Sequence, residues 1–482
     1  IPSIATSTNS GNSIKIPYFN ALAENKDFTI TPRLYFNNDI LIQNEYRHVE
    51  KNLNHISDFS IKKLDKGTKS HFFSNSKVNL NSNNFLNSNL EINLEKTSND
   101  TYLKSEQLKT SIQNNQSLLN SYVKYEAFAE DIDILLEIAA YEDLTKEKNS
   151  DKYQFILPSF KLSKNLLPTS LIKGNLKYSA SGVSQKRNTN ITENYLINDF
   201  DYTSNPVFNK NGFVSNFNLF FKNVSKKGRN SNTYEDNFKN ENFILADYTL
   251  NLPLKKEGIN FNSNISPKIL FKYNPFKSKN LKDLDRQINS TNIFSRNRLG
   301  LGDSLEGGQS VTVGFDYELL RKNDKKIFSS NLGQIFRDAN EIKLPTTSKM
   351  QNKSSDIVGA ITYTPNDMFE LNYNYSADNN LDTMNYTFLE NKININNFVT
   401  SFSFLEENNE IGSDSYFSRN IGYKFDQNNM MKFNTRRNRK TDLTEYYNLI
   451  YEYKNDCLVA AIEYNKNYYE DRDIRPTEEI TF

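Results

Sequence analysis

The sequence is short of several residues on which small domains and enzymes depend. Its 482 residues include one cysteine, three histidines and no tryptophan. The single thiol, Cys457, excludes an internal disulfide framework, and His48, His55 and His71 lack the spacing of a zinc site. No nucleophile elbow, catalytic triad or phosphate-binding loop can be found. We therefore predict a protein that is not an enzyme and that needs no cofactor and no metal.

Long hydrophobic runs are absent as well. The most apolar stretch, CLVAAIEY at 457–464, is far shorter than the roughly eighteen residues that a membrane-spanning helix requires. The pattern therefore excludes a helical membrane protein. A formal net charge of +1 gives no reason to expect nucleic acid as a partner.

Aromatic residues are abundant and are spread along the whole chain. The 34 Phe and 28 Tyr argue against disorder, because disordered chains are poor in aromatic residues. A mean hydropathy of -0.71 is nevertheless too polar for a large conventional core. Both observations fit a hollow barrel, in which alternate residues of each strand face lipid and water.

Alternation with a period of two recurs along the chain. In residues 27–48, Phe28, Ile30, Pro32 and Leu34 alternate with polar residues, and the pattern resumes after a short turn. Similar runs occupy 85–97, 174–182, 213–224, 310–319, 368–377 and 449–456. Short turns and long polar tracts separate the runs. The predicted fold is all-β: a large antiparallel transmembrane β-barrel of the outer-membrane type, with about 24–26 strands.

Two features leave alternatives open. A soluble β-sandwich or solenoid also alternates, but a solenoid of this length would show a fixed repeat, which is absent here. Residues 129–147, AEDIDILLEIAAYEDLTKE, fit either a helix or two strands.

Several segments resemble, in the same order, those of the LPS-assembly family LptD, also called OstA. The segment 9–48 resembles the start of the family's barrel and contains prolines at the family's positions. Six further segments resemble family landmarks, at 97–105, 265–276, 296–319, 332–338, 355–365 and 451–482. The last of these is similar to the family's C-terminal hairpin, and we expect its final strand to be truncated at Phe482.

The resemblance implies a location, a division of the chain and a set of partners. We expect residues 1–12 to be a junction to an absent N-terminal periplasmic domain and residues 13–482 to form the barrel in the cell outer membrane. The implied ligand is lipopolysaccharide. The implied protein partners are an LptE-like lipoprotein plug, an LptA-like periplasmic bridge and, during folding, the barrel-assembly machinery.

The resemblance also implies a lateral gate between the first and last barrel strands. Pro17 and Pro32 cannot donate to a ladder, so they would weaken pairing at this gate and let lipopolysaccharide leave sideways. The alternative is that both prolines merely end strands at a rim. The residues predicted to form the gate are Ile14, Ile16, Pro17, Pro32, Ile480 and Phe482.

Two further sites are predicted near the C-terminus. In the family, this hairpin turn often carries cysteines that bond to the N-terminal domain, so Cys457 is a candidate for one such disulfide; an unpaired thiol is the alternative. Arg436, Arg437, Arg439 and Lys440 are expected in an outward-facing loop, where they would meet lipopolysaccharide phosphates or simply be solvated. For the whole chain, a passive porin-like or other outer-membrane transport barrel, or a surface adhesin, remains the alternative function.

Overall fold

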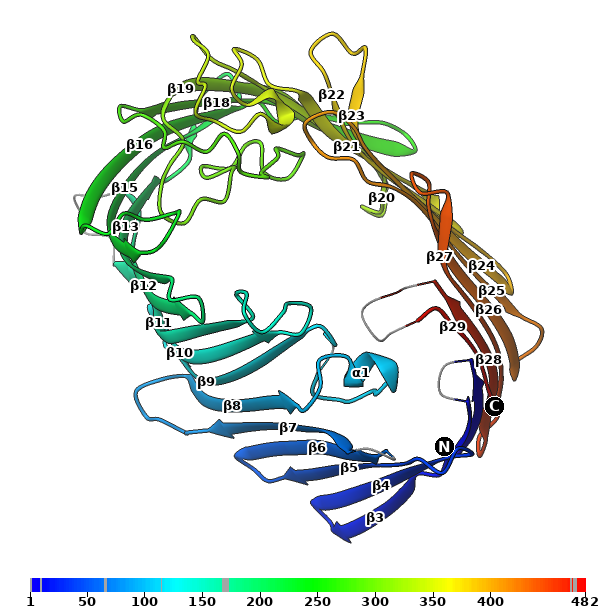
Figure 1. Ribbon diagram of the computed structural model, residues 1–482. Coiled ribbons are helices and arrows are strands. Elements are labelled where there is room, and N and C mark those ends of the chain that lie inside the picture. The colour runs from blue at the N-terminus through cyan, green and yellow to red at the C-terminus, as the bar shows by residue number, and fades with distance from the viewer. Residues whose placement is uncertain are drawn as a thin grey trace.

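The strands form one antiparallel sheet that closes on itself. The computed structural model describes residues 2–8, 11–64, 67–113, 115–166, 173–468, 470 and 475–482. Within them, the sheet closes into a barrel of 26 strands that surrounds a lumen (Figure 1). Three short segments are not separate barrel strands, because β3 continues β2 after a break, and β14 and β17 are additions at one rim.

The strand bounds follow the chain in order. The first half of the barrel contains β1 (Ser3–Ser7), β2 (Gly11–Lys15), β3 (Tyr18–Ala23), β4 (Lys26–Tyr35), β5 (Ile40–Val49), β6 (Leu53–Lys63), β7 (Thr68–Asn79), β8 (Asn87–Thr97), β9 (Leu118–Phe128), β10 (Ile132–Asp143), β11 (Tyr153–Leu166), β12 (Gly174–Arg187), β13 (Thr192–Ser204), β14 (Val207–Phe208) and β15 (Val214–Arg229). The second half contains β16 (Lys239–Asn251), β17 (Leu254–Glu257), β18 (Phe261–Asn274), β19 (Gly308–Arg321), β20 (Lys326–Phe336), β21 (Ile357–Asn366), β22 (Phe369–Ala377), β23 (Met384–Ile395), β24 (Phe398–Glu407), β25 (Ser415–Lys424), β26 (Asn429–Asn438), β27 (Leu443–Lys454), β28 (Val459–Asn467) and β29 (Thr477–Thr481). The described helices are α1 (Tyr102–Ser105) and the 3-10 turn η1 (Thr347–Lys349).

The period of two seen in the sequence separates a lipid face from a luminal face. On β4 and β5, Leu34 and Ile42 are 45% and 37% exposed, whereas Tyr35 and Leu41 are 4% and 2% exposed. Successive side chains of a strand point to opposite faces, so the exposed set faces outward and the buried set faces the lumen. The predicted all-β barrel is confirmed.

The two rims of the barrel differ in the length of their connections. Loops 98–117, 275–307 and 337–356 leave one rim, which we call the long-loop rim. Turns as short as 367–368 and 396–397 leave the opposite, short-turn rim. In bacterial outer-membrane barrels the short turns are periplasmic and the long loops extracellular.

Long loops fold inward into the lumen (Figure 1). Their apolar side chains pack against the wall there. Loop 98–117, which contains α1, packs Tyr102 and Leu103 against Leu41 and Phe73 of the wall. Loops 275–307 and 337–356 share a second cluster with the wall, formed by Leu281, Ile288, Ile293, Leu299, Leu301, Ile335, Leu344, Met350 and Val358. These apolar clusters are therefore buried on the luminal side of the wall, where the loops pack against the strands.

Two expectations from the sequence need correction. Residues 129–147 contain neither a helix nor two strands, but the single strand β10, because both of its edges pair with neighbouring strands. Strand pairing also begins at Ser3, inside the segment 1–12 that was expected to be a junction. Whether another domain precedes the barrel stays a prediction. In the described part of the chain, no helix is both long and apolar enough to cross a membrane.

A glycine lets the second luminal loop approach the wall. Gly333 of β20 lies under Phe294 and Ile293, and a Cβ built at this position would lie 3.0 Å from Phe294 and 3.1 Å from Ile293. These atoms belong to loop side chains, so a larger residue would displace the loop rather than the wall.

Replacing this glycine should therefore loosen loop 275–307. We expect Gly333→Val to cost about 1–3 kcal/mol of loop docking through overpacking. Proteolytic cleavage within the loop of the folded barrel should accelerate by roughly tenfold or more. Gly422→Val is the matched control, because a Cβ there meets only Val399 O at 3.8 Å. Equal cleavage of the two variants would contradict this account.

Candidate functional site

The barrel closes where the two chain ends meet, and this seam is one of the most weakly paired joints of the wall. Strand β1 pairs with β29 over three residues, Ala5 to Ser7, opposite Thr481 to Glu479. Reciprocal backbone bonds between Ile4 and Phe482 add to this joint. By comparison, β18 and β19 pair over fourteen residues. The seam therefore holds far fewer ladder bonds than an ordinary joint.

Strand β1 lies between the strands that were predicted to meet directly. The segment containing Ile14 pairs with β1 on one side and β4 on the other, and only β1 reaches β29. Ile16 and Ile480 therefore do not face each other. The expectation of direct pairing fails because residues 3–7 supply an additional strand.

Both predicted gate prolines lie at the joint between β2, β3 and β4. Pro17 lies in the break between β2 and β3, and Pro32 lies within β4. The Ile16 N–H donates to Pro32 O at 3.0 Å. In an antiparallel ladder this geometry normally comes with a reciprocal bond, which Pro32 cannot donate. The prolines thus weaken the joint between β2 and β4, which pair over three residues. The hairpin β1–β2 separates this joint from β29.

The half of the seam toward the short-turn rim has no connecting strand in the described part of the chain. Strand β3 pairs with β4 alone, and all six of its residues are exposed. On the other side, Val459–Ile462 of β28 pair with β27 but not with β29. Closure therefore rests on the half of the seam toward the long-loop rim.

The luminal loop 98–117 is anchored beside this seam by Glu106. Its buried carboxylate accepts bonds from Tyr35 Oη at 2.5 Å and from Lys62 Nζ at 2.9 Å. Arg33 donates to the Glu106 carbonyl at 3.1 Å and to Ser13 Oγ at 3.0 Å. The loop is thus tied to β4, which itself contacts β2 at the weak joint.

A buried polar chain holds α1 against the wall. Asp58 accepts a bond from His71 at 2.8 Å, and Ser60 Oγ lies 2.7 Å from both His71 Nδ1 and Tyr102 Oη. The carboxylate has acceptors only, so His71 Nε2 donates to it. Burial is the main cause that raises the pKa of the Tyr102 phenol to about 12. The protonated phenol is therefore the form that fits this site.

One contact links the same loop to the last strand. Gln107 Nε2 donates to Glu479 Oε2 at 3.3 Å, across 372 positions of sequence. Glu479 is buried and pairs with Ser7 of β1. Loop 98–117 therefore touches both flanks of the seam, through Glu106 on the β4 side and Gln107 on the β29 side.

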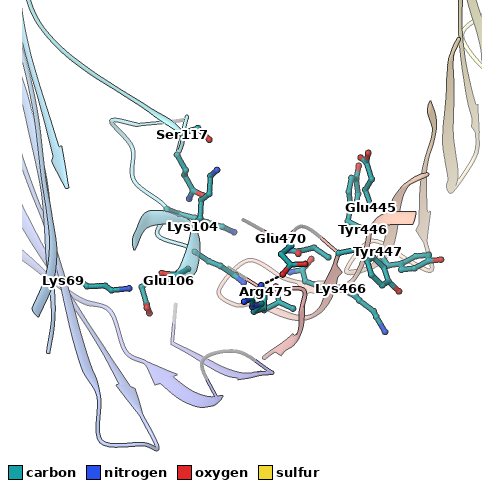
Figure 2. Close-up of a pocket in the computed structure, with 18 of the residues that line it drawn as sticks. Lys69, Lys104, Glu106, Ser117, Glu445, Tyr446, Tyr447, Lys466, Glu470 and Arg475 are labelled. Atoms are coloured by element: carbon teal, nitrogen blue, oxygen red, sulfur yellow. Dashed lines mark hydrogen bonds and ion pairs between the residues drawn. The ribbon is translucent and has the colours of Figure 1, made fainter. Parts of the chain in front are cut away.

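A cavity with a volume of ≈ 1270 Å³ lies between this loop and the last strands. Figure 2 shows Lys69, Lys104 and Glu106 on one side of it and Glu445 and Tyr446 on the other. Thr477 of β29 also lines it. Most residues that line this cavity are polar or charged, and it lies directly behind the seam.

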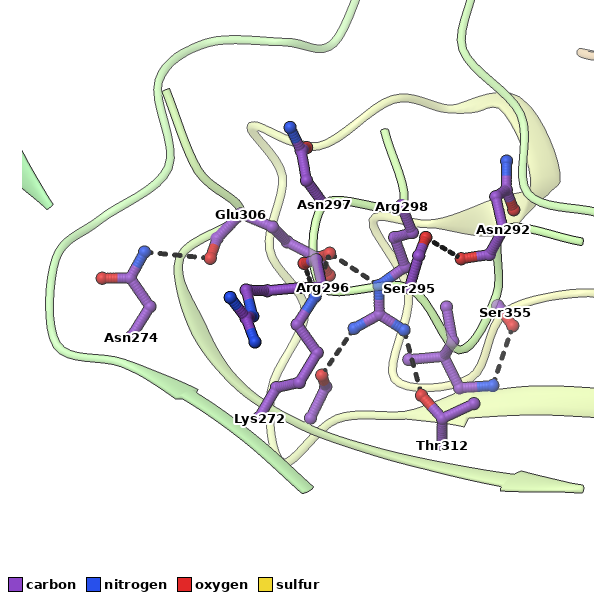
Figure 3. A network of polar contacts seen from close by, with 12 residues as sticks. Lys272, Asn274, Asn292, Ser295, Arg296, Asn297, Arg298, Glu306, Thr312 and Ser355 are labelled. Carbon is purple, nitrogen blue, oxygen red and sulfur yellow. Dashed lines mark hydrogen bonds and ion pairs between the residues drawn. The ribbon is translucent and has the colours of Figure 1, made fainter. Parts of the chain in front are cut away.

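Loop 275–307 is anchored to the opposite wall by a buried arginine (Figure 3). Arg298 donates to Glu306 at 2.7 Å, Thr312 at 3.0 Å and Ser310 at 2.8 Å. Burial lowers the pKa of Arg298 to about 9. Arg337 pairs with the same carboxylate. These contacts fix the loop to β19 and to the start of loop 337–356, away from the seam.

The predicted basic cluster and cysteine lie on opposite rims. Arg436 and Arg437 belong to β26 rather than to a loop, because both pair with β25 and β27. Arg439 and Lys440 follow in the turn at the long-loop rim. Cys457 is exposed in the turn between β27 and β28 at the short-turn rim.

Each arginine of this cluster already contacts a carboxylate. Arg436 pairs with Glu445 at 3.0 Å, Arg439 lies 3.3 Å from Glu406, and Arg437 pairs with Asp442. These ion pairs indicate that the arginines stabilise the barrel wall and its rim. Among the described residues, no group of histidine, cysteine or acidic side chains could hold a metal ion.

Sequence reasoning missed Glu106, Gln107 and Glu479. The family-like segment 97–105 ends one residue before Glu106. Nothing in the pattern shows that this loop turns inward, since polar loops also extend into solvent.

The comparisons with known proteins give one family and several barrels. A family model described as "LptD: LPS transport system D" matches residues 68–427. No curated protein matches. Solved structures with similarity include the ferric preacinetobactin receptor BauA from Acinetobacter baumannii (8% identity, TM-score 0.32, covering 100% of this chain and 78% of that chain). Another is the alcaligin outer-membrane receptor FauA from Bordetella pertussis (6% identity, TM-score 0.33, covering 100% and 74%).

The buried phenol makes the docking of loop 98–117 depend on pH. A free tyrosine titrates near about 10, and the pKa of Tyr102 is raised to about 12. The folded state therefore keeps a proton that the undocked loop loses. Docking should be fully stabilised below about pH 10 and weaken as pH rises toward 12. Proteolytic cleavage within 98–117 should accelerate over this range.

Tyr102→Phe should reduce that pH dependence, while the bond from the Tyr35 phenol to Glu106 leaves part of it in place. The variant should also lose about 1 kcal/mol of docking, because the bond to Ser60 is gone. Tyr423→Phe, at an exposed position on β25, should keep the slope of the unaltered protein. A slope that is unchanged in Tyr102→Phe would show that another group is responsible.

The contact between Gln107 and Glu479 should hold the seam closed. We expect Gln107→Ala to make opening easier by about 1 kcal/mol, or roughly fivefold. The measurement is the rate of maleimide labelling of Ser7→Cys in a Cys457→Ser background. Gln116→Ala is the control, because Gln116 bonds to Leu108 O within the same loop at 2.8 Å. Equal labelling in both variants would refute a role for this contact.

Proposed function

Because this chain belongs to the LptD family of the LPS transport system, we propose that it inserts lipopolysaccharide into the outer leaflet through the seam beside β1. The family consists of transport barrels and not of enzymes, and the chain is an outer-membrane protein. The observation that carries the proposal is the scarcity of strand pairing at the two joints that flank the β1–β2 hairpin.

The energetics of pairing favour this seam as the exit. A backbone hydrogen bond contributes about 1 kcal/mol net in water, and an unpaired group in hydrocarbon costs several kcal/mol. A joint of fourteen paired residues would thus be prohibitively costly to open. The joints β1–β29 and β2–β4 have three paired residues each, and Pro32 removes one donor from the second.

We expect the hairpin β1–β2 to be the segment that moves when the seam opens. It is held by five paired residues internally and by three on each side. Moving it as a unit would open the half of the seam toward the long-loop rim. In this proposal, Ile14, Ile16, Pro17 and Pro32 act at the β4 side and Ile480 and Phe482 at the β29 side.

Family membership also carries the partner proposals. These are an LptE-like lipoprotein plug, an LptA-like periplasmic bridge, and assembly by the barrel-assembly machinery. Cys457 is exposed at the short-turn rim, so it is accessible to a cysteine of a periplasmic domain. The basic cluster at Arg436 is a weaker candidate for lipopolysaccharide, because its arginines are already ion-paired.

A disulfide lock tests the proposal. Ala5 and Thr481 lie opposite each other across β1 and β29, flanked by the bonds of Ile4 and Phe482. In a Cys457→Ser background, Ala5→Cys with Thr481→Cys should form a disulfide. Surface lipopolysaccharide should then fall, and a reductant should restore it. A second lock, Ile14→Cys with Leu34→Cys, tests the β2–β4 joint.

The control lock lies in a fully paired part of the wall. Asn434→Cys with Asn448→Cys joins β26 to β27, which pair over ten residues, and should leave lipopolysaccharide display unchanged. If both seam locks form and lipopolysaccharide still reaches the surface, exit through this seam is refuted. If depletion of the protein does not alter lipopolysaccharide display at all, a passive porin-like barrel becomes the better account.

A further inference from the structure

A second cavity lies in the outer surface of the wall, away from the seam. It is a groove with a volume of ≈ 470 Å³ that crosses β15, β16, β18, β19 and β20. Strands β16, β18 and β19 lie across the barrel from the two chain ends (Figure 1). Five aromatic side chains line this groove, namely Phe217, Tyr248, Phe271, Tyr273 and Phe336. We call it the aromatic groove.

The strand register places the aromatic groove on the lipid face of the wall. Phe217 pairs with Tyr248, and Tyr248 pairs with Phe271. Paired residues of neighbouring strands share one face of a sheet. The next residue along β18, Lys272, donates to Arg296 O of the luminal loop 275–307 at 2.6 Å. Phe271 and its partners therefore point outward into lipid, because successive side chains of a strand alternate.

The groove consists of two neighbouring rows of side chains. The first, the aromatic row, continues from β18 through Val311 to Phe336. The second, the rim row, contains Ala246, Tyr273 and Gln309, which pair in that order. It is nearer the long-loop rim, because β18 ends and β19 begins beside it. Ala246 contributes only a methyl group, so the rings around it border a hollow rather than a filled surface.

The wall also changes height at this place. Strand β16 pairs with β15 from Lys239 to Asn251, but with β18 only from Ala246 to Asn251. In the described part of the chain, residues 239–245 pair with no strand on the β18 side. Strands β15 and β16 thus project beyond β18 at the long-loop rim, and the aromatic groove lies at the foot of this step. A molecule in the groove is sheltered on one side by the projecting strands.

We propose that the aromatic groove binds one acyl chain of an outer-leaflet glycolipid, whose sugar hydroxyls contact Gln309 and Asp338. In such barrels the long loops are extracellular, so the rim row lies at the level of the headgroups of the outer leaflet. The inference goes beyond the proposed function, since this groove is on the outer wall and involves none of the strands that form the seam.

Size and polarity favour a single acyl chain as the occupant. The volume of ≈ 470 Å³ is in the lower part of the roughly 300–1000 Å³ that ligand pockets usually have, which suits one chain better than a whole lipid with several chains. Phe217, Phe271 and Phe336 offer apolar ring surface and no hydrogen-bonding group. Contact between these rings and a hydrocarbon chain leaves no polar group of the ligand without a partner.

The charges at the rim row favour a sugar over a phosphate. Gln309 Nε2 donates to Asp338 Oδ2 at 2.7 Å, and both residues are exposed. An amide and a carboxylate can exchange hydrogen bonds with hydroxyl groups, whereas a carboxylate repels a phosphate. The cations that line the groove, Lys272 and Arg337, are buried and turn toward the lumen, where Arg337 pairs with Glu306.

The chain contains no tryptophan, so one introduced indole can report on lipid at the groove. Phe336→Trp is the reporter, and Phe72→Trp on β7 is the matched control. The two phenylalanines are 43% and 48% exposed, and both lie near the long-loop rim. Phe72 faces lipid, because its neighbour Phe73 packs in the luminal cluster with Tyr102.

The measurement is quenching of this indole by lipids with brominated acyl chains. The full-length protein with its partners is placed in nanodiscs, and the fluorescence of the unaltered complex is subtracted. The probes are a glycolipid with an uncharged sugar, phosphatidylethanolamine and phosphatidylglycerol, each at the same mole fraction. We expect the glycolipid to quench Phe336→Trp at least about threefold more strongly than either phospholipid does. All three lipids should quench Phe72→Trp equally.

Filling the hollow tests the acyl-chain site. Ala246→Phe should abolish the excess quenching of Phe336→Trp, because the added ring occupies the space of the chain. Ala140→Phe is the control substitution, since Ala140 lies on the lipid face of β10, two positions from the exposed Ile138. The control should keep the excess quenching.

Removing the polar pair tests the headgroup contact. Gln309→Ala together with Asp338→Ala should abolish the preference for the glycolipid, so that the three lipids quench Phe336→Trp equally. The brominated chains should still quench this reporter, because the aromatic row is unchanged. A preference that persists in this double variant would overturn the assignment of the sugar contacts.

The other outcomes are equally decisive. Equal quenching of the two reporters by every lipid, or excess quenching that persists in Ala246→Phe, would overturn the groove as a lipid site. Stronger quenching of Phe336→Trp by a phospholipid than by the glycolipid would overturn the choice of occupant. In each of these cases the disulfide-lock result would stand. Lipopolysaccharide display that ignores the seam locks would refute the proposed exit and leave the aromatic groove as assigned.

Discussion

The need to pair every backbone group within the bilayer governs this structure. Hydrocarbon offers no hydrogen bonds, so strands can span it only as a closed wall in which each edge meets another. The barrel satisfies this demand amply over most of its circumference. At the seam it does so with the short strands β1 and β29, and only on the half toward the long-loop rim. The place where closure is least secure is therefore set by strand length and by two prolines.

The luminal loops compensate for that weakness from inside. Loop 98–117 contacts β4 through Glu106 and β29 through Gln107, so its docking and the closure of the seam are coupled. Loop 275–307 is anchored through Arg298 on another part of the wall. The two loops thus have different relations to the seam, although both are long and polar in sequence. Buried charges remain acceptable in them because each anchoring group has hydrogen-bonded partners.

The sequence predicted the structure correctly where a local pattern fits only one kind of secondary structure. Alternation with a period of two at Phe28, Ile30 and Leu34 predicted strands, because each strand must present one face to lipid and one to water. It failed at 129–147, where mixed apolar and acidic residues satisfy more than one local pattern. It also misplaced Arg436 in a loop, since strand ends cannot be read to within a few residues. Pro32 lies within a strand as predicted, whereas Pro17 lies between β2 and β3. The partners of these segments were not predicted, because pairing depends on a strand supplied by residues 3–7.

The sequence by itself determined the class of wall, the approximate number of strands and the positions where ladder donors are missing. Those properties depend on periodicity and on proline, and both are visible one residue at a time. Only the tertiary structure decided that β1 completes the ring, that the prolines weaken the β2–β4 joint, and that a loop of mixed polarity turns inward to meet Glu479. These features join residues far apart in the chain, and their energies depend on geometry that no local pattern contains.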